Sequence, residues 1–243
     1  MTHKTNGIIL RSIKYGETSL VVTVLTELFG IQSYLLNGVR SSKRSAGANL
    51  FQPSSILELV VYHNEQKSLQ RIKEFKWKFL YQHILSDVVK NCVALYMVEL
   101  ITKCLKQPET QEELYHFCEA ALIQLDQADA GITANFPLYF SLHLTHFFGF
   151  RLHDNYNTAN HYLDLEEGNF TEQQPQHPHF IEADLAAATS QLLKVMQPHE
   201  LSEFKLNGAM RKKLLLSYQD YYALHIPDFG QMKTLRVLSE VLS

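Results

Sequence analysis

The sequence predicts an α+β protein with two domains, a small closed β-barrel of five strands followed by a bundle of helices. Up to residue 80 the chain holds five short apolar runs separated by turn residues, and beyond it apolar residues recur at helical spacing. The formal charge also changes sign between these two parts of the chain. Residues 1–80 hold 11 Lys and Arg against 5 Asp and Glu, a formal charge of +6, and residues 81–243 hold 11 against 20, a charge of −9. We therefore predict domains at 1–80 and 81–243.

Five segments are predicted to be strands, because each is short and rich in β-branched or aromatic residues. They are Gly7–Tyr15, Leu20–Thr26, Ile31–Asn37, Ser55–Tyr62 and Ser68–Phe79. Glycines at positions 16, 30 and 38 fall at the strand ends, where the chain must turn. This strand count, with a longer loop after the third strand, favours an oligonucleotide-binding (OB) barrel, and an SH3-like barrel is the main alternative.

The remainder is predicted to be helical. Thr110 and Glu113 have the spacing of a capping box, and Asn207 is placed as the N-cap of a later helix. Residues 150–180 break the helical pattern and are predicted to be irregular. The other predicted helices are Ser86–Leu105, Asn135–Phe148, residues 181–196 and Gln231–Leu242.

Several classes of protein are excluded. No apolar run reaches the roughly 18 residues that span a bilayer, and no signal-peptide core follows Met1, so we expect a cytoplasmic protein. Cys92, Cys104 and Cys118 lie in apolar helical segments and form no Cys-x-x-Cys pair, which predicts buried thiols. The chain carries no nucleophile-elbow, phosphate-loop or dinucleotide-binding motif, so we do not expect an enzyme.

The loop after the third strand is the main candidate for binding a polyanion. It carries Arg40, Lys43 and Arg44 among Ser and Gly residues, and Arg and Lys are the side chains that bind phosphates. A solvated basic loop is the alternative. In the fifth strand the cations alternate with Phe75 and Trp77, which adds Lys73 and Lys76 to the candidate DNA-binding residues.

Other candidates carry a weaker signal. Tyr34 in the third strand either stacks on a base or packs in the barrel, and Arg11 and Lys14 are further cations of the first strand. One cluster of three cations follows Asn207 and forms either a secondary contact with DNA or a partner, or the exposed face of a helix. It consists of Arg211, Lys212 and Lys213.

No metal or cofactor is expected. The segment 151–180 contains four histidines, His153, His161, His177 and His179, but their spacing matches no helical or finger-type zinc site. A metal-dependent enzyme using this segment is an alternative that metal analysis would exclude.

Several short motifs follow one another along nearly the whole chain. They are Gly7-Ile8-Ile9-Leu10-Arg11, Tyr15-Gly16-Glu17-Thr18-Ser19, Leu25-Thr26-Glu27 with Phe29-Gly30, Asn37-Gly38-Val39-Arg40, Leu50-Phe51-Gln52-Pro53, Phe147-Phe148-Gly149-Phe150 and Tyr221-Tyr222-Ala223-Leu224-His225. Taken together and in this order, they resemble the RecO family of bacterial DNA repair proteins. The combination is more specific than any one motif.

The resemblance implies an N-terminal OB domain, a helical C-terminal domain and a recombination mediator associated with the nucleoid. Such a protein binds single- and double-stranded DNA and anneals complementary strands. With RecR it helps to load RecA onto DNA coated by single-stranded DNA-binding protein (SSB), whose acidic C-terminal tail it contacts. The family's basic residues after the third strand fall on Arg40, Lys43 and Arg44.

The chain departs from the family at one point. Many members carry a four-cysteine zinc module after the Phe-Gly-Phe motif, and residues 151–180 contain no cysteine, so the resemblance implies a variant without zinc. A protein–protein adaptor, whose barrel recognises a peptide, is the alternative from another functional class. Steep salt dependence of DNA binding would distinguish a mediator from an adaptor.

Overall fold

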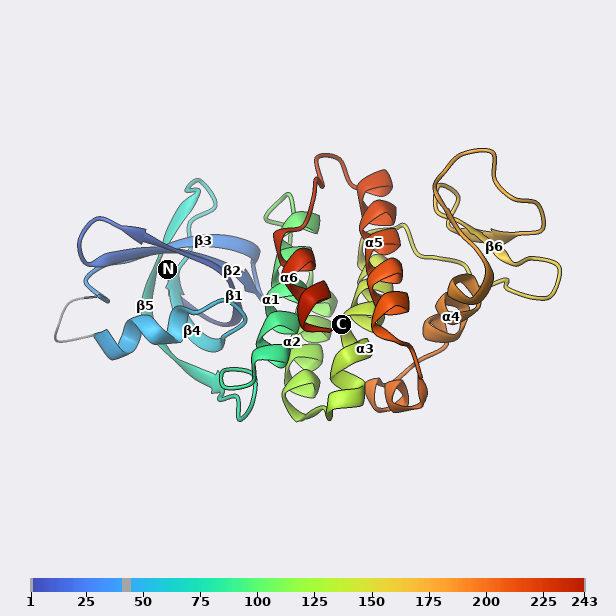
Figure 1. The fold of residues 1–243 in the computed structure, drawn as a ribbon. Helices are drawn as coiled ribbons and strands as arrows, with labels where there is room; N and C mark the ends of the chain where they lie inside the picture. Colours follow the sequence, from blue (N-terminus) through green and yellow to red (C-terminus); the bar gives the residue numbers. More distant parts are fainter. Residues whose placement is uncertain (1, 41–44, 243) are drawn as a thin grey trace. The chain divides into compact units, whose positions relative to one another are not determined.

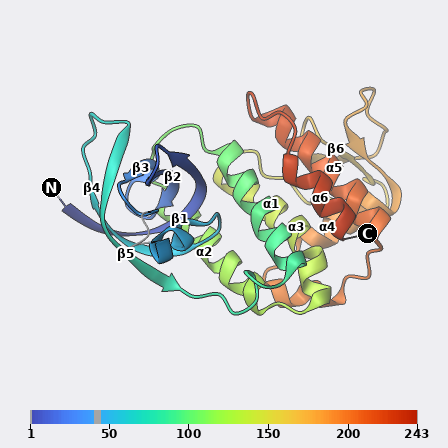
Figure 2. The same ribbon diagram turned by 60° about the vertical axis from the view of Figure 1, so that its left-hand side comes forward.

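A computed structural model describes residues 2–40 and 45–242 of the chain (Figure 1, Figure 2). The chain forms two compact units. The first comprises Met1–His83 and Leu105–Asp126, and the second comprises Ile84–Cys104 and Gln127–Ser243. Within the described residues, no helix combines the length and apolar character needed to cross a membrane. The domain boundary predicted at residue 80 stays a prediction.

The first unit contains a closed barrel of five strands in the order β1-β2-β3-β5-β4. β4 pairs antiparallel with β1, and a short parallel pairing of β3 with β5 completes the closure. The barrel predicted from the sequence is confirmed. Its strands are β1 (Thr2–Tyr15), β2 (Ser19–Thr26), β3 (Gly30–Leu36), β4 (Ile56–Tyr62) and β5 (Leu69–Phe79).

β1 begins before the predicted position, because its polar first residues pair with β4. Thr2 lies opposite Tyr62 and Asn6 lies opposite Glu58. This polar stretch shows no alternation of apolar residues, so only the partner strand identifies it as a strand. Side chains of alternate residues fill the barrel, among them Val22, Val24 and Leu57, none of which is exposed. Each contributes about 1.5–3 kcal/mol by burial.

A short 3-10 helix, η1 (Ser45–Phe51), lies between β3 and β4. Phe51 is only 1% exposed and packs edge-on against Phe75 of β5, with 4.8 Å between ring centroids. The helix therefore supplies a large apolar side chain to the barrel core.

Helix α2 (Glu112–Gln127) belongs to the same unit as the barrel. Lys78 of β5 forms an ion pair of 2.8 Å with Glu119 of α2. The buried carboxylate of Asp126 accepts hydrogen bonds from the backbone N–H groups of Gln82 and His83, each at 2.9 Å. These contacts join α2 to the fifth strand and to the chain that follows it.

The predicted capping box at Thr110 is wrong. α2 begins at Glu112, and the Thr110 hydroxyl donates a hydrogen bond of 3.0 Å to the carbonyl of Leu28 in the β2–β3 turn. The hydroxyl that the local pattern predicted to cap the helix therefore forms a tertiary hydrogen bond instead.

The second unit is mainly helical. α1 contacts α3 and α6, and α3 also contacts α4 and α5 (Figure 1). Asn207 is the N-cap of α5 as predicted, and its side chain accepts from the backbone N–H of Met210 at 2.9 Å. The helices of this unit are α1 (Val88–Cys104), α3 (Ala130–Leu144), η2 (Thr145–Phe147), α4 (Ala183–Leu193), η3 (Pro198–Glu203), α5 (Gly208–His225) and α6 (Lys233–Val241).

The segment predicted to be irregular contains a small sheet in the order β7-β6-β8. Its strands are β6 (Tyr162–Asp164), β7 (Asn169–Thr171) and β8 (Phe180–Ile181). Strands of two or three residues are too short to show an alternating pattern in the sequence. Asp164 closes the β6–β7 turn by accepting from the N–H groups of Glu166 and Glu167 at 2.8 and 3.1 Å. Cys92, Cys104 and Cys118 form no disulfide bond within the described part of the chain.

Candidate nucleic-acid interface

The register of the barrel aligns one row of outward side chains across all five strands. Ile13 lies opposite Val21, Val21 opposite Leu35, Leu35 opposite Arg71, and Arg71 opposite Tyr62. Residues directly opposite each other share a face of the sheet. Arg71 is exposed, and Ile13 and Tyr62 are 43% and 46% exposed, so this row points away from the core.

A second outward row lies beside the first. Arg11 lies opposite Thr23, Thr23 opposite Ser33, and Ser33 opposite Leu69. Each of these four residues is two positions from a member of the first row on its own strand, and such residues share a face. Leu69 is 41% exposed. We call the two rows the outer face. It comprises Arg11, Ile13, Val21, Thr23, Ser33, Leu35, Tyr62, Leu69 and Arg71.

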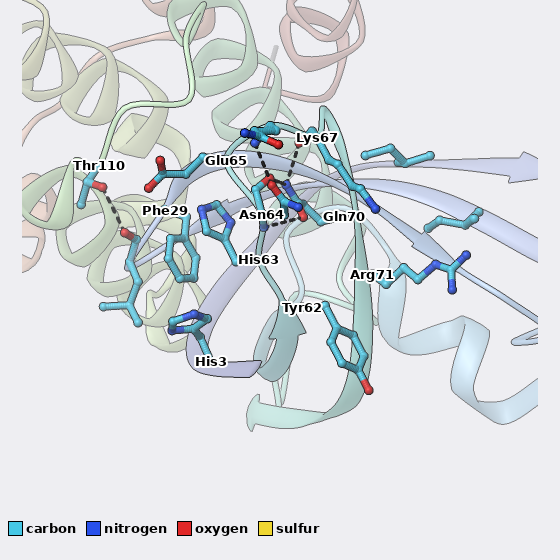
Figure 3. A pocket seen from close by; sticks show the side chains of 14 residues that line it. His3, Phe29, Tyr62, His63, Asn64, Glu65, Lys67, Gln70, Arg71 and Thr110 are labelled. Carbon is cyan, nitrogen blue, oxygen red and sulfur yellow. Dashed lines mark hydrogen bonds between the residues drawn. The ribbon is translucent and has the colours of Figure 1, made fainter. Parts of the chain in front are cut away.

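An open groove of about 1220 Å³ adjoins the outer face (Figure 3). The groove and the outer face share four residues, which are Leu35, Tyr62, Leu69 and Arg71. Figure 3 shows Tyr62 and Arg71 on one side of the groove. Three rings lie on its other side, at the ends of three different strands. They are His3, Phe29 and His63.

These rings are packed against one another. Phe29 and His63 are stacked with centroids 3.9 Å apart, and His3 meets Phe29 edge-on at 5.4 Å. The β4–β5 loop that carries His63 is fixed by Gln70. The side-chain amide of Gln70 donates to the carbonyls of Asn64 and Lys67, each at 2.7 Å. The groove therefore has a preorganised wall.

The arrangement combines the two kinds of contact that single-stranded nucleic acids require. Arginine side chains bind backbone phosphates, and exposed aromatic or apolar side chains accept unstacked bases. Neither Arg11 nor Arg71 forms an ion pair with a residue in the described part of the chain. Glu65 also lines the groove, so the local charge is mixed at its rim.

The chain matches two family profiles, described as "Recombination protein O N terminal" over residues 1–81 and "Recombination protein O C terminal" over residues 85–235. It is 31% identical over 241 residues to a protein of Azobacteroides pseudotrichonymphae named DNA repair protein RecO, with 99% of each chain covered. The chain belongs to the RecO family. Proteins of the same name in Bacteroides fragilis and Flavobacterium psychrophilum are 33% and 32% identical to it, over at least 99% of each chain.

Membership of the RecO family gives the protein a role in DNA repair and recombination. It confirms the resemblance seen in the sequence motifs. It also agrees with the closed barrel of the first unit and the helices of the second.

The predicted DNA-binding residues of β1 lie on opposite faces of the strand. A bulge at Leu10 shifts the register between Ile9 and Arg11. Beyond it, Arg11 lies on the outer face, whereas Lys14 lies opposite Leu20, a residue of the barrel core, although Lys14 is itself exposed at the strand end. Arg11 and Lys14 are three positions apart, and such residues point to opposite faces of a strand because side chains alternate.

Tyr34, proposed from the sequence as a possible stacking residue, lies inside the barrel. None of its surface is exposed, and burial raises the pKa of its hydroxyl above the usual range. A buried ring offers no face to a base, so the structure supports the packing role that was its alternative. Only the pairing of Tyr34 with Val22 and Gln70 in an inward row reveals this.

The predicted lysines of β5 are exposed but paired with carboxylates. Lys73 forms an ion pair with the neighbouring Glu74 at 3.2 Å, and Lys76 forms one with Glu58 of β4 at 2.8 Å. Surface pairs of this kind are weak and can exchange for phosphate, but they lower the local positive potential. Their role in DNA binding stays a prediction.

The basic loop is described only at its start. The backbone N–H of Arg40 donates to the carbonyl of Thr18 at 2.9 Å, which places Arg40 beside the β1–β2 turn. Lys43 and Arg44 lie outside the described residues. The prediction that these three cations bind DNA therefore stays open.

In the second unit, the three predicted cations of α5 differ in their surroundings. The guanidinium of Arg211 donates to the carbonyls of Leu206 and Leu242, and burial lowers its pKa. Arg211 therefore ties the start of α5 to the end of α6. Lys212 and Lys213 are exposed.

Two residues of the outer face, Tyr62 and Arg71, were not predicted from the sequence, and neither was the groove wall formed by His3, Phe29 and His63. Arg71 belongs to the alternating pattern of the fifth strand, which was the available signal. Nothing in the sequence indicates that it lies between Leu35 and Tyr62, because the parallel β3–β5 pairing joins segments far apart in the chain.

Proposed function

We propose that the outer face and its groove bind single-stranded DNA with little sequence preference. The main support for this proposal is that Arg11 and Arg71 lie on one surface with the exposed side chains of Ile13, Tyr62 and Leu69. Among the described residues, neither arginine has an ion-pair partner. Cations that follow the backbone and apolar surfaces that accept bases need no hydrogen bonds to base edges.

Single strands suit this surface better than a duplex does. Only unpaired bases expose their faces to Tyr62 or to the rings of the groove, whereas a duplex presents mainly phosphates. The basic loop with Arg40, Lys43 and Arg44 is the proposed contact for double-stranded DNA and a further candidate contact for single strands. Lys212 and Lys213 are proposed as a secondary contact with DNA or a partner.

The wider activity that we propose is that of a recombination mediator without catalytic chemistry or a required cofactor. It anneals complementary strands and, with RecR, helps to load RecA onto SSB-coated DNA, contacting the acidic tail of SSB. Annealing requires only that positive charge reduces the repulsion between two strands while base edges stay free to pair. Family membership and the chemistry of the outer face support this proposal.

The test is fluorescence anisotropy of a labelled single-stranded oligonucleotide across a salt series. The variant Arg11→Ala/Arg71→Ala should bind more weakly. Its slope of log affinity against log salt should be shallower by about 1.4, since each phosphate contact on a single strand contributes about 0.7. Tyr62→Ala should lose about 1–3 kcal/mol of binding with an unchanged slope, because stacking releases no counterions.

Arg236→Ala is the matched control. Arg236 is exposed on α6 of the second unit, where it forms a surface ion pair of 3.8 Å with Glu240. Equal salt slopes for the control and the double variant, with both folded by circular dichroism, would remove the outer face from the DNA site. Salt-insensitive or absent DNA binding by the parent protein would favour a peptide-binding adaptor instead.

A further inference from the structure

A second cluster of chemically active side chains lies in the first unit, outside the outer face and its groove. It joins Glu27, in the turn between β2 and β3, to Glu112 and His116 in the first turns of α2. One ligand atom from each of the three residues lies within 4.8 Å of the other two. We propose that these three side chains bind one Zn²⁺ ion.

The distances from His116 to the two carboxylates lie within ion-pair range and also match the spacing of ligands around one metal ion. His116 Nε2 lies 3.4 Å from Glu27 Oε1 and 3.6 Å from Glu112 Oε1. Both exceed the range of about 2.7–3.2 Å typical of N–H···O bonds, and one ring nitrogen has a single hydrogen to offer two carboxylates. Ligands about 2.0–2.2 Å from a tetrahedral zinc ion are separated by about 3.4 Å.

The charge balance also favours a cation. Two carboxylates converge here. Across the described residues, His116 is the one basic side chain that lies within ion-pair distance of either carboxylate. A divalent ion would neutralise both. One imidazole with two carboxylates suits Zn²⁺, whereas Ca²⁺ and Mg²⁺ prefer oxygen ligands alone.

Other contacts hold the two ligand-bearing segments in place. The amide of Asn6 donates to the second carboxylate oxygen of Glu27 at 2.7 Å, which orients it as outer-shell partners orient metal ligands. The Thr110 hydroxyl bonds to the carbonyl of Leu28, one residue beyond Glu27. Glu112 and His116 are one helical turn apart and so lie on one face of α2. Zinc would fasten the start of α2 to the β2–β3 turn.

This site differs from the zinc module expected elsewhere in the family and from the sequence prediction of no metal. It was missed because Glu27 is far from α2 in sequence. Its three protein ligands leave the fourth tetrahedral position to water.

The test is titration of the metal-stripped full-length protein with ZnCl₂ by calorimetry, and with Co²⁺ by the visible absorption of its tetrahedral complexes. We expect one ion per chain and a higher melting temperature with zinc, because zinc binds the folded state. His116→Ala and Glu27→Gln should abolish stoichiometric binding. Asn6→Ala should weaken it about 10–100-fold, the usual effect of losing an outer-shell partner.

Glu113→Gln and His199→Ala are the matched controls, since both residues are exposed and Glu113 adjoins Glu112 on the same helix. Both controls should bind zinc as the parent does. The proposal fails if the parent binds no stoichiometric zinc, or if His116→Ala binds it as tightly as His199→Ala. Since His116 is exposed, its variant should stay folded, which circular dichroism checks.

Discussion

Gly30 shows how a single residue fixes the contact between the barrel and the segment before α2. Its φ is +60°, a conformation that side chains other than glycine rarely adopt. A Cβ atom there would lie 1.9 Å from the carbonyl oxygen of Glu109. The glycine therefore serves both the β2–β3 turn and the close approach of a segment distant in sequence.

We predict that Gly30→Ala strongly destabilises the protein. The left-handed backbone costs a non-glycine residue about 1–2 kcal/mol, and the clash with Glu109 adds about 1–3 kcal/mol. Urea unfolding measures the change. Gly16→Ala is the control, because Gly16 has a φ of +59° but no atom within 4 Å of an added Cβ. Equal losses of stability in the two variants would show that the Glu109 contact contributes nothing.

The sequence showed which side chains are chemically suited to DNA binding more often than it showed which face of a strand they lie on. The cationic character of Arg11 and Lys14 was evident, but the pairing of β1 with β2 decides that Arg11, and not Lys14, lies on the outer face. Tyr34 carried the signal of a stacking residue, and the partner strands turn it inward. Orientation depends on pairing with other segments, which a local pattern does not contain.

At the scale of elements, helix α6 shows a start that depends on another helix. Glu99 of α1 accepts from the backbone N–H groups of Lys233 and Thr234 at 2.9 and 2.8 Å, and from the Thr234 hydroxyl at 2.6 Å. The side chain of the N-cap residue, Met232, makes no capping hydrogen bond. A carboxylate from α1 thus satisfies the first N–H groups of α6.

We predict that Glu99→Ala lowers the free energy of unfolding by about 1–2 kcal/mol, the usual effect of losing a helix cap. Hydrogen exchange should accelerate at the start of α6. Glu240→Ala removes an exposed carboxylate from the end of the same helix and should cost less than about 0.5 kcal/mol. If the two variants lose the same stability, the Glu99 contacts do not cap α6.

At the scale of the whole molecule, the division of charge is the main property relevant to DNA. Residues 1–80 carry +6 and residues 81–243 carry −9. The barrel is therefore the part suited to a polyanion, and the acidic remainder is better suited to protein partners. Two regions of the barrel segment compete as the principal DNA contact, the outer face and the basic loop.

The triple variant Arg40→Ala/Lys43→Ala/Arg44→Ala distinguishes these regions. If the loop contributes three phosphate contacts, the salt slope for single-stranded DNA should flatten by about 2, at about 0.7 per contact. The fold should survive, because Lys and Arg side chains are rarely buried in a protein core. An unchanged slope in the folded variant would leave the outer face, or Lys212 and Lys213, as the DNA contact.

By itself the sequence determined that a β-barrel is followed by a helical region. It also determined the five strands of the barrel, most of the helices and the family. These follow from apolar periodicity, turn glycines and ordered motifs, which are properties of neighbouring residues. Only the tertiary structure decided which side chains share a surface. The parallel β3–β5 pairing brings Arg71 beside Leu35, and the packing of α2 brings His116 beside Glu27. Each of these two contacts joins residues far apart in the chain. Burial of apolar surface, rather than the local preference of neighbouring residues, brings such segments together.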